Sequence, residues 1–340
     1  MSGIVSDNID RQSGVIAEAA GGAEIRSDDP SASEGTVWFN TTSGTLKVYR
    51  NISAWSSGGA LGTAVANHTG FGLQGAAVSV GGHDGSRTAE CEEYNGSTWT
   101  TSGVNDLGTA TQDMPSCGTQ TAGLVTGGWT GSTVATGTEY DGSSWATAGA
   151  GDLSTARYGH GMGGIQTAAF AVAGYDGSNR IQTTEEYDGS SWSSGNNNAA
   201  TKDGIQQGCG GTLTAGLLVG GTTNGSSALA VTEEYDGTNW SAGGNLNTGR
   251  WVHTAEGLQT DAFTAGGTSD NGSTIIATVE TYNGSAWSSG TSLATATRDP
   301  AGAGNAASAG LLFGGKNPSS RTTNTFELSA TTTARTVTDS

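Results

Sequence analysis

The residues that could carry out catalysis or bind a metal in this chain are few and far apart in the sequence. They are His68, His83, His160, His253, Cys91, Cys117 and Cys209. No two cysteines form a C-x-x-C pair that could hold zinc, and three are too few for a disulfide framework. The chain contains no Gly-x-Ser-x-Gly elbow and no phosphate-binding loop. We therefore expect buried cysteines, structural histidines with satisfied hydrogen bonds, no catalytic residue, no metal and no cofactor.

Aromatic and cationic side chains offer a different chemistry, because rings and guanidinium groups suit the binding of ligands. Several stand in or beside segments rich in Gly, Ser and Asn. The candidate ligand-binding residues are His83, Arg87, Trp129, Tyr158, Tyr175, Arg180 and Trp251. The four Trp and Tyr rings could stack on sugar rings or contact a protein. The alternative is that they only cover strand edges and pack between loops.

The charge of the chain excludes some classes of partner. The 340 residues carry 31 acidic and 13 basic side chains, for a net charge of -18. Nucleic acids and anionic membranes draw much of their affinity from Lys and Arg, so neither is an expected partner. No apolar run approaches the roughly 20 residues that a membrane helix needs. We expect no membrane insertion and no cleaved signal peptide.

The chain has 58 glycines and only 13% charged residues, a composition that is also typical of disordered, low-complexity sequences. Internal repeats distinguish a folded chain from a disordered one. One motif, Tyr-Asp/Asn-Gly-x-x-Trp, recurs about every 47 residues. Its copies are Tyr94–Trp99, Tyr140–Trp145, Tyr187–Trp192, Tyr235–Trp240 and Tyr282–Trp287, and Trp55 stands one repeat upstream. The Asp-Gly or Asn-Gly pair between two short runs predicts a tight hairpin.

A second marker, a short apolar run that ends in a glycine pair, recurs in phase with the first. The pairs are Gly81–Gly82, Gly127–Gly128, Ala173–Gly174, Gly220–Gly221, Gly266–Gly267 and Gly314–Gly315. The apolar runs are short and bounded by Gly, which indicates strands and no helix. With a small-residue strand before each apolar run, every repeat has four strands, as a propeller blade does.

These repeats resemble the kelch repeat, whose blade carries a di-glycine after the second strand and a Tyr and a Trp on the third and fourth. The resemblance implies an all-β, kelch-like β-propeller of four-stranded antiparallel blades. We predict an irregular N-terminal arm over residues 1–33 and a propeller over 34–340, with a partial blade at 34–60 and six repeats at 61–340. This arrangement slightly favours seven blades over six. The five Tyr and Trp pairs are expected in the core.

The segment Glu34–Tyr49 resembles a short hairpin found near the start of virion appendage proteins of tailed bacteriophages, especially marine cyanophage-type phages. The Glu-Tyr-Asp-Gly-Ser-Ser-Trp repeats are also similar to predicted structural proteins of such phages. This resemblance implies a virion protein, assembled in the cytoplasm of the bacterial host. Residues 1–33 are then either an anchoring arm that contacts other virion proteins or a disordered tail.

The repeat also predicts two different faces. The turns between strands one and two and between strands three and four leave a blade on one side. That side carries Asp141, Asp188 and Asp236 with Glu92, Glu139, Glu185 and Glu233 nearby, so it should be acidic and monotonous. The other side carries loops that differ in every copy, and near the axis it holds Arg157, Tyr158, Arg250, Trp251 and Arg298. Loops on a rigid scaffold can vary freely, so this side is the expected recognition surface.

We therefore expect a non-enzymatic, tail-associated virion protein that presents a variable propeller face to a protein or to host-surface glycan. One alternative is a decoration protein of the capsid surface. Another is a carbohydrate-active enzyme of a phage tail, although the Asp-Gly turns lack the spacing of the sialidase Asp-box. A calcium site in the Asp270–Gly272 loop is a further, weaker option.

Overall fold

The computed structural model of the chain describes residues 24–28, 30, 36–147, 149–270 and 273–337. Every regular element in these ranges is a β-strand, as predicted. No helix long and apolar enough to cross a membrane is found in them. The chain divides into two compact units. The larger unit is Trp55–Ser329, and the smaller one combines Met1–Ala54 with Ala330–Ser340.

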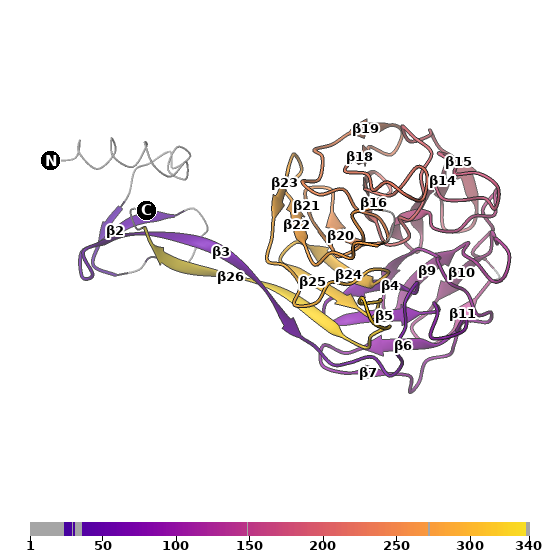
Figure 1. The fold of residues 1–340 in the computed structure, drawn as a ribbon, viewed down its shortest axis with the longest axis horizontal. Coiled ribbons are helices and arrows are strands. Elements are labelled where there is room, and N and C mark those ends of the chain that lie inside the picture. Colours follow the sequence, from indigo (N-terminus) through magenta and orange to yellow (C-terminus); the bar gives the residue numbers. More distant parts are fainter. Residues whose placement is uncertain (1–23, 29, 31–35, 148, 271–272, 338–340) are drawn as a thin grey trace. The chain divides into compact units, whose positions relative to one another are not determined.

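The larger unit is a β-propeller, in which the blades surround a common axis (Figure 1). Five blades are four-stranded antiparallel sheets, numbered here in chain order from the innermost strand outward. Blade 1 is β4 (Thr69–Leu73), β5 (Ala76–Val80), β6 (Cys91–Tyr94) and β7 (Trp99–Thr100). Blade 2 is β8 (Ser116–Thr119), β9 (Ala122–Thr126), β10 (Gly137–Tyr140) and β11 (Trp145–Ala146). Blade 3 is β12 (Gly161–Ile165), β13 (Ala168–Val172), β14 (Thr184–Tyr187) and β15 (Trp192–Ser194). Blade 4 is β16 (Cys209–Thr212), β17 (Ala215–Val219), β18 (Thr232–Tyr235) and β19 (Trp240–Ala242). Blade 5 is β20 (Thr254–Leu258), β21 (Asp261–Ala265), β22 (Val279–Tyr282) and β23 (Trp287–Ser289).

The sixth blade joins the two ends of the propeller. It consists of β24 (Ala301–Ala306), β25 (Ala309–Phe313), β26 (Thr325–Thr336) and, as the neighbour of β26, β3 (Thr45–Ser57). Trp55 of β3 packs against Phe263 with ring centroids 5.9 Å apart. Just beyond β3, Gly58 N donates to Thr325 O at 2.9 Å. The described residues thus form six blades, and the preference for seven is wrong. The Trp55 run is no part of a further blade, because it supplies the outer strand that the last repeat lacks.

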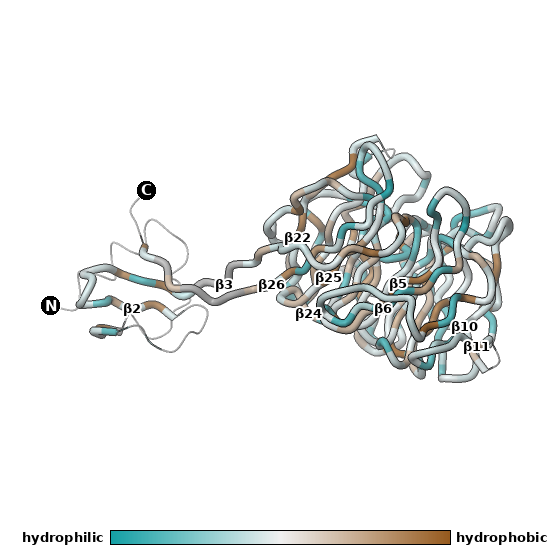
Figure 2. Tube along the Cα trace, turned by 90° about the horizontal axis from the view of Figure 1, so that it is seen from below, coloured by the Kyte–Doolittle hydropathy of each residue, from teal (hydrophilic) through white to brown (hydrophobic). Residues whose placement is uncertain are grey.

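The Tyr and Trp of each repeat face each other across the predicted hairpin. Tyr94 pairs with Trp99 and Tyr140 with Trp145, and the rings lie 4.9 and 4.6 Å apart. All five repeat tyrosines are at most 2% exposed, so their place in the core is confirmed. Among the repeat tryptophans Trp287 is buried, so the core prediction holds for it. The other four are half-buried, so for them it holds only in part: Trp99, Trp145, Trp192 and Trp240. The second strand of a blade is buried along most of its length, as in β5 from Ala77 to Val80, and hydrophobic segments lie within the propeller (Figure 2).

Glycine allows the innermost strands to approach one another around the axis. An added Cβ on Gly210 of β16 would lie 2.9 Å from Gly257 O of β20, and one on Gly163 of β12 would lie 2.8 Å from Gly210 O. Both distances are too short for a real side chain. The high glycine content therefore supports a narrow ring rather than a disordered chain.

The smaller unit contains a short sheet. β1 (Glu24–Arg26) runs parallel to β2 (Val37–Asn40), and β2 pairs antiparallel with the first residues of β3. Trp38 is fully buried, and its ring lies 4.6 Å from that of Tyr49. Residues 34–54, predicted as part of a propeller blade, thus belong to this unit where they are described. The rest of the predicted arm, residues 1–23 with 29 and 31–33, lies outside the described residues.

Candidate functional site

The turns and loops of the blades gather on two faces of the propeller, as the repeat predicts. The Asp-Gly turn of blade 3 lies against the turn between β12 and β13, because an added Cβ on Gly189 would be 3.4 Å from Thr167 O. We call the side with these turns the hairpin face. The opposite side, which we call the loop face, carries the segments 83–88, 129–133, 175–180, 222–227, 268–270 with 273–274, and 316–321.

The hairpin face is less acidic than the sequence suggests. Asp141 is exposed, and its Oδ1 accepts hydrogen bonds from Ser143 N at 2.9 Å and Ser144 N at 2.8 Å. These bonds lower the pKa of Asp141 to about 2. Glu92, Glu185 and Glu233, however, are at most 4% exposed. The prediction that these three glutamates lie on an acidic surface is wrong, because Glu185 and Glu233 pair with buried cations and Glu92 accepts a hydrogen bond from Gly62 N. Glu139 is half-buried and accepts a hydrogen bond from the Tyr187 hydroxyl at 2.9 Å.

Arg157 and Arg250, predicted near the axis of the loop face, are also unavailable to a ligand. Both are fully buried. Arg157 Nη2 contacts Glu185 Oε1 at 2.5 Å, and Arg250 Nη2 contacts Glu280 Oε1 at 2.7 Å. The two guanidinium groups therefore join strands within blades 3 and 5 rather than point toward solvent.

A ring of backbone hydrogen bonds closes around the axis beneath the loop face. Each blade contributes one residue with a positive φ, just before its inner strand. These residues are Asn67 (56°), Asp113 (55°), Gly159 (62°), Gly204 (70°), Val252 (48°) and Asp299 (53°). The bonds run from Asp113 N to Asn67 O, Gly159 N to Asp113 O, Ile205 N to Gly159 O, Val252 N to Gly204 O, Asp299 N to Val252 O and Asn67 N to Asp299 O, at 2.8 to 3.2 Å. We call this the axial ring.

A pocket of about 270 Å³ lies at the axial ring and is the candidate functional site. Its lining combines carboxylates, amides, a guanidinium group and two aromatic rings. The lining side chains are Asn67, Asp113, Tyr158, Asp203, Gln206, Trp251, Val252, Arg298 and Asp299, with Gly159 and Gly204. We call it the axial pocket.

Two carboxyl groups of the axial pocket share one amide. Asn67 Nδ2 donates to Asp113 Oδ1 at 2.8 Å and to Asp299 Oδ1 at 3.3 Å. Burial and the neighbouring Asp113 raise the pKa of Asp299 to about 7, although Arg298 and Lys316 oppose the shift. Burial also raises the pKa of Asp113. The neutral form of the Asp299 carboxyl group is therefore favoured up to a much higher pH than that of an ordinary aspartate.

Two buried side-chain atoms of this pocket, Gln206 Oε1 and Arg298 Nε, have no hydrogen-bond partner among the described residues. Arg298 Nε lies 3.7 Å from Asp299 Oδ2. The side chain of Gln206 is 5% exposed, and its Oε1 accepts no hydrogen bond. Blade 4 has two more residues than blade 3 just before its inner strand. Three residues separate Gly204 from Gly208 in blade 4, whereas one separates the corresponding Gly159 from Gly161 in blade 3, and Gln206 and Gln207 are the additional residues. Gln207 crosses the axis, where its Nε2 donates to Thr69 Oγ1 at 2.6 Å and its Oε1 accepts from Gly302 N at 3.3 Å.

Five of the seven predicted ligand-binding residues lie at or beside the axial pocket. Tyr158 and Trp251 line it. The ring of Tyr158 lies 5.5 Å from Trp129 on one side and 5.5 Å from Tyr175 on the other. Arg180 lies over the Tyr175 ring at 5.8 Å, and its Nε contacts Asp203 Oδ1 at 2.7 Å. The aromatic cluster therefore continues from the pocket across blades 2 and 3.

His83 and Arg87 belong to a different part of the loop face. His83 Nδ1 lies 2.6 Å from Arg321 Nη2, and Arg87 reaches toward Gly131 of the next blade, whose added Cβ would be 3.3 Å from Arg87 Nη2. These two residues join neighbouring loops and do not line the axial pocket.

Sequence reasoning missed several residues of the axial pocket: Asn67, Asp113, Asp203, Gln206 and Asp299. Asn67, Asp113 and Asp299 are the residues with positive φ in the axial ring, and Asp203 immediately precedes such a residue. An alignment of the six repeats at this position would have shown that polar residues recur there, although it would not show which ones meet across the axis.

The three cysteines are buried, as predicted. His68, His160 and His253 are also buried, but the prediction of satisfied hydrogen bonds fits only His160, whose Nε2 lies 3.1 Å from Thr126 Oγ1, because both ring nitrogens of His68 and of His253 lack a hydrogen-bond partner among the described residues. Burial lowers the pKa of His68 to about 3 and that of His160 and His253 well below the ordinary value. No group of three or more potential metal ligands occurs within the described part of the chain. In the loop considered for calcium, Asp270 Oδ2 accepts from Thr274 Oγ1 at 2.6 Å, while residues 271–272 lie outside the described residues.

Neither a scan against protein-family models nor a search of the curated proteins found a match for this chain.

Proposed function

We propose that this protein is a non-enzymatic structural component of a phage virion, tail-associated, whose loop face binds host-surface glycan at the axial pocket. The observation that carries the binding function is the composition of that pocket. Two aromatic rings, Tyr158 and Trp251, stand beside amide, carboxylate and guanidinium groups in one cavity. Sugars present C–H faces that pack on aromatic rings, and hydroxyl groups that need several hydrogen-bonding partners.

A glycan array tests this binding function. We expect the wild-type protein to bind a subset of bacterial surface glycans, and we expect Tyr158→Ala and Trp251→Ala to lose that binding. Ile165→Ala is the matched control, because Ile165 is 52% exposed in β12 at the hairpin face. Unfolding temperatures of all variants show whether each protein is folded. Unchanged binding in both aromatic variants would contradict the proposal.

The virion role rests on the resemblance of Glu34–Tyr49 to phage appendage hairpins, and one feature of the smaller unit supports an attachment there. Ile25 and Phe39 are paired neighbours in β1 and β2 and are 77% and 37% exposed. We propose that this unit and the preceding arm attach the propeller to other virion proteins. A density map of the whole particle tests this attachment, and a loop face buried against the virion would exclude host contact.

A carbohydrate-active enzyme is a second candidate, because one observation favours it. Asp113 and Asp299 form a carboxyl pair in the axial pocket, and their pKa values are raised. Glycosidases use one protonated and one ionised carboxyl group. If the protein cleaves a polysaccharide that it binds, Asp113→Asn and Asp299→Asn should each abolish cleavage. If the wild-type protein cleaves no polysaccharide, the enzymatic function is excluded and the binding function remains.

A further inference from the structure

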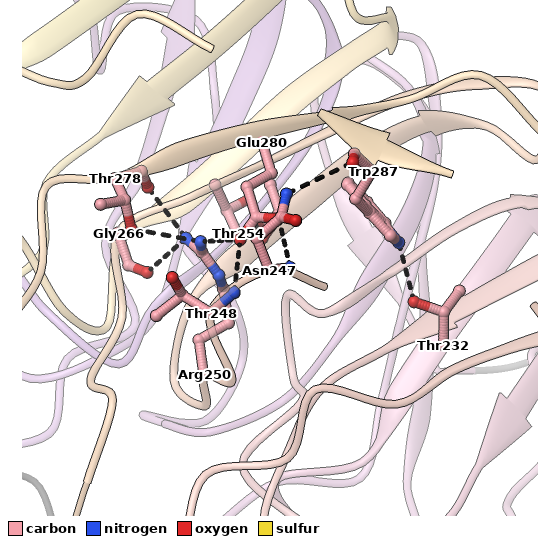
Figure 3. A network of polar contacts seen from close by, with 10 residues as sticks. Thr232, Asn247, Thr248, Arg250, Thr254, Gly266, Thr278, Glu280 and Trp287 are labelled. Atoms are coloured by element: carbon pink, nitrogen blue, oxygen red, sulfur yellow. Dashed lines mark hydrogen bonds and ion pairs between the residues drawn. The ribbon is translucent and has the colours of Figure 1, made fainter. Parts of the chain in front are cut away.

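Three consecutive blades bury a cation at the same position of the repeat. The cations are Arg157, Lys202 and Arg250, and each pairs with a buried glutamate on the third strand of its blade, Glu185, Glu233 and Glu280. Figure 3 shows the contacts of Arg250 in blade 5. These positions are all at most 2% exposed. The repeat thus contains a built pocket for a cationic side chain.

The arginine pocket has the same acceptors in blades 3 and 5. Arg250 Nη1 donates to Gly266 O at 3.1 Å and to Thr278 O at 2.8 Å. Arg157 Nη1 donates to Ala173 O and Thr183 O, both at 3.1 Å. Two main-chain carbonyls therefore bind one edge of the guanidinium group, and the glutamate binds the other.

Blade 2 has the same pocket without its occupant. Thr111 stands in the place of the arginine and Thr138 in the place of the glutamate. A cavity of about 340 Å³ lies there, lined by both threonines and by Gly127, Thr136 and Trp145. Gly127 and Thr136 correspond to the two residues whose carbonyls bind arginine in blades 3 and 5. Gly127 N donates to Thr136 O at 3.0 Å, as Ala173 N donates to Thr183 O at 3.0 Å, so the local backbone bonding is retained.

Blades 1 and 6, which also lack the cation, keep a larger side chain at one of the two positions. In blade 6, Phe326 replaces the glutamate and is 7% exposed within a hydrophobic cluster. In blade 1, Glu92 remains and accepts a hydrogen bond from Gly62 N at 2.8 Å. Blade 2 has small residues at both positions, which explains its cavity.

We propose that the blade 2 cavity binds the guanidinium group of an arginine side chain or of a small arginine-like molecule. The carbonyls of Gly127 and Thr136 match one edge of that group, and Leu107, Val125 and Trp145 provide apolar walls for its methylene chain. A guanidinium group is weakly hydrated, so it enters a site without a carboxylate at lower cost than an ammonium group. The net charge of -18 attracts a cation to the surface.

Titration with agmatine, followed by calorimetry and by the unfolding temperature, tests the proposal on the full chain. We expect saturable binding of agmatine and no comparable binding of cadaverine, which ends in an ammonium group. A capped Gly-Arg-Gly peptide distinguishes the source, because tighter binding of the peptide indicates an arginine of a partner protein. No saturable binding of either guanidinium compound would overturn the proposal.

Two variants fill the cavity and serve as matched controls. Thr138→Phe reproduces the side chain of blade 6, and the double change Thr111→Arg with Thr138→Glu reproduces the ion pair of blades 3 and 5. Both should abolish agmatine binding, and the double variant should also unfold at a higher temperature than the wild type. Retained binding in a folded Thr138→Phe protein would show that agmatine binds elsewhere, which also overturns the proposal.

Discussion

Asp299 belongs to the axial ring, and its carboxyl group lies beside that of Asp113. Its carboxyl group is 8% exposed and shares the amide of Asn67 with Asp113. Burial and this second carboxyl group favour its neutral form, and the folded pKa of about 7 exceeds the ordinary 3.8. The backbone of Asp299, with a φ of 53°, is part of the axial ring, in which its N donates to Val252 O at 2.8 Å.

The raised pKa of Asp299 predicts how stability depends on pH. The folded state holds a proton that the unfolded state releases, so the favourable contribution is complete below pH 3.8 and is lost as the pH rises to about 7. One pKa unit corresponds to about 1.4 kcal/mol, so the loss amounts to a few kcal/mol. We expect Asp299→Asn to flatten the decrease in unfolding free energy across this range. Urea unfolding of both proteins at several pH values measures the unfolding free energy. The same dependence on pH in the variant and in the wild type would contradict the prediction.

At the scale of the strands, neighbouring blades are joined by a repeated tyrosine–glutamate hydrogen bond. The Tyr OH of one blade donates to the second Glu on the third strand of the blade before it. Tyr140 donates to Glu93 at 2.8 Å and Tyr187 to Glu139 at 2.9 Å. The exception lies between blades 5 and 6, where Leu328 replaces the Tyr and Thr281 replaces the Glu. Donor and acceptor are therefore absent together, and no carboxylate is left without a donor.

A double-mutant cycle on Tyr187 and Glu139 tests this coupling. Tyr187→Phe should destabilise the propeller, because a hydrogen bond to a charged group contributes about 1.5–3 kcal/mol. Glu139→Thr should also destabilise it, but the double variant should lose less than the sum of the two. Chemical unfolding provides the energies. Strict additivity would mean that the two side chains are not coupled.

The strands and the blade structure could be predicted from the sequence because they depend on local patterns. The turn between Tyr94 and Trp99 and the apolar run before Gly81 each require nothing beyond the residues of one repeat. The site could be predicted only in part, since Tyr158 and Trp251 were identified but Asp113 and Asp299 were not. Asp113 and Asp299 lie close together because of the number of blades and the contacts across the axis, and the sequence of a single repeat encodes neither.

At the scale of the whole molecule, the propeller is closed by residues from both of its ends. Trp55 packs in one hydrophobic cluster with Phe326 and Leu328 of β26. Its Nε1 also donates to Thr291 O at 2.9 Å. The outer strand of blade 6 therefore precedes blade 1 in the sequence, while the other three strands of that blade come last.

This closure predicts a difference between two shortened chains. Residues 55–329 should fold and unfold cooperatively. Residues 58–329 lack the outer strand of blade 6 and should be less stable by roughly 1–3 kcal/mol, since Trp55 is half-buried and loss of a fully buried Trp side chain costs about 3–5 kcal/mol. The stability of Trp55→Ala in the longer chain should lie between those of the two shortened chains. Hydrogen exchange in β25 and β26 should rise most in 58–329, and equal protection in both chains would contradict the role of β3.

The placement of β3 beside β26 also bears on how such a chain could be assembled from parts. The chain enters the propeller at Trp55 of β3 and leaves it at Ser329 of β26, and these two strands are neighbours. The smaller unit takes its residues from both sides of that stretch. In genetic terms the propeller is a cassette inserted within another domain. Such a cassette can be exchanged for a propeller with different loops while the flanking residues remain the same.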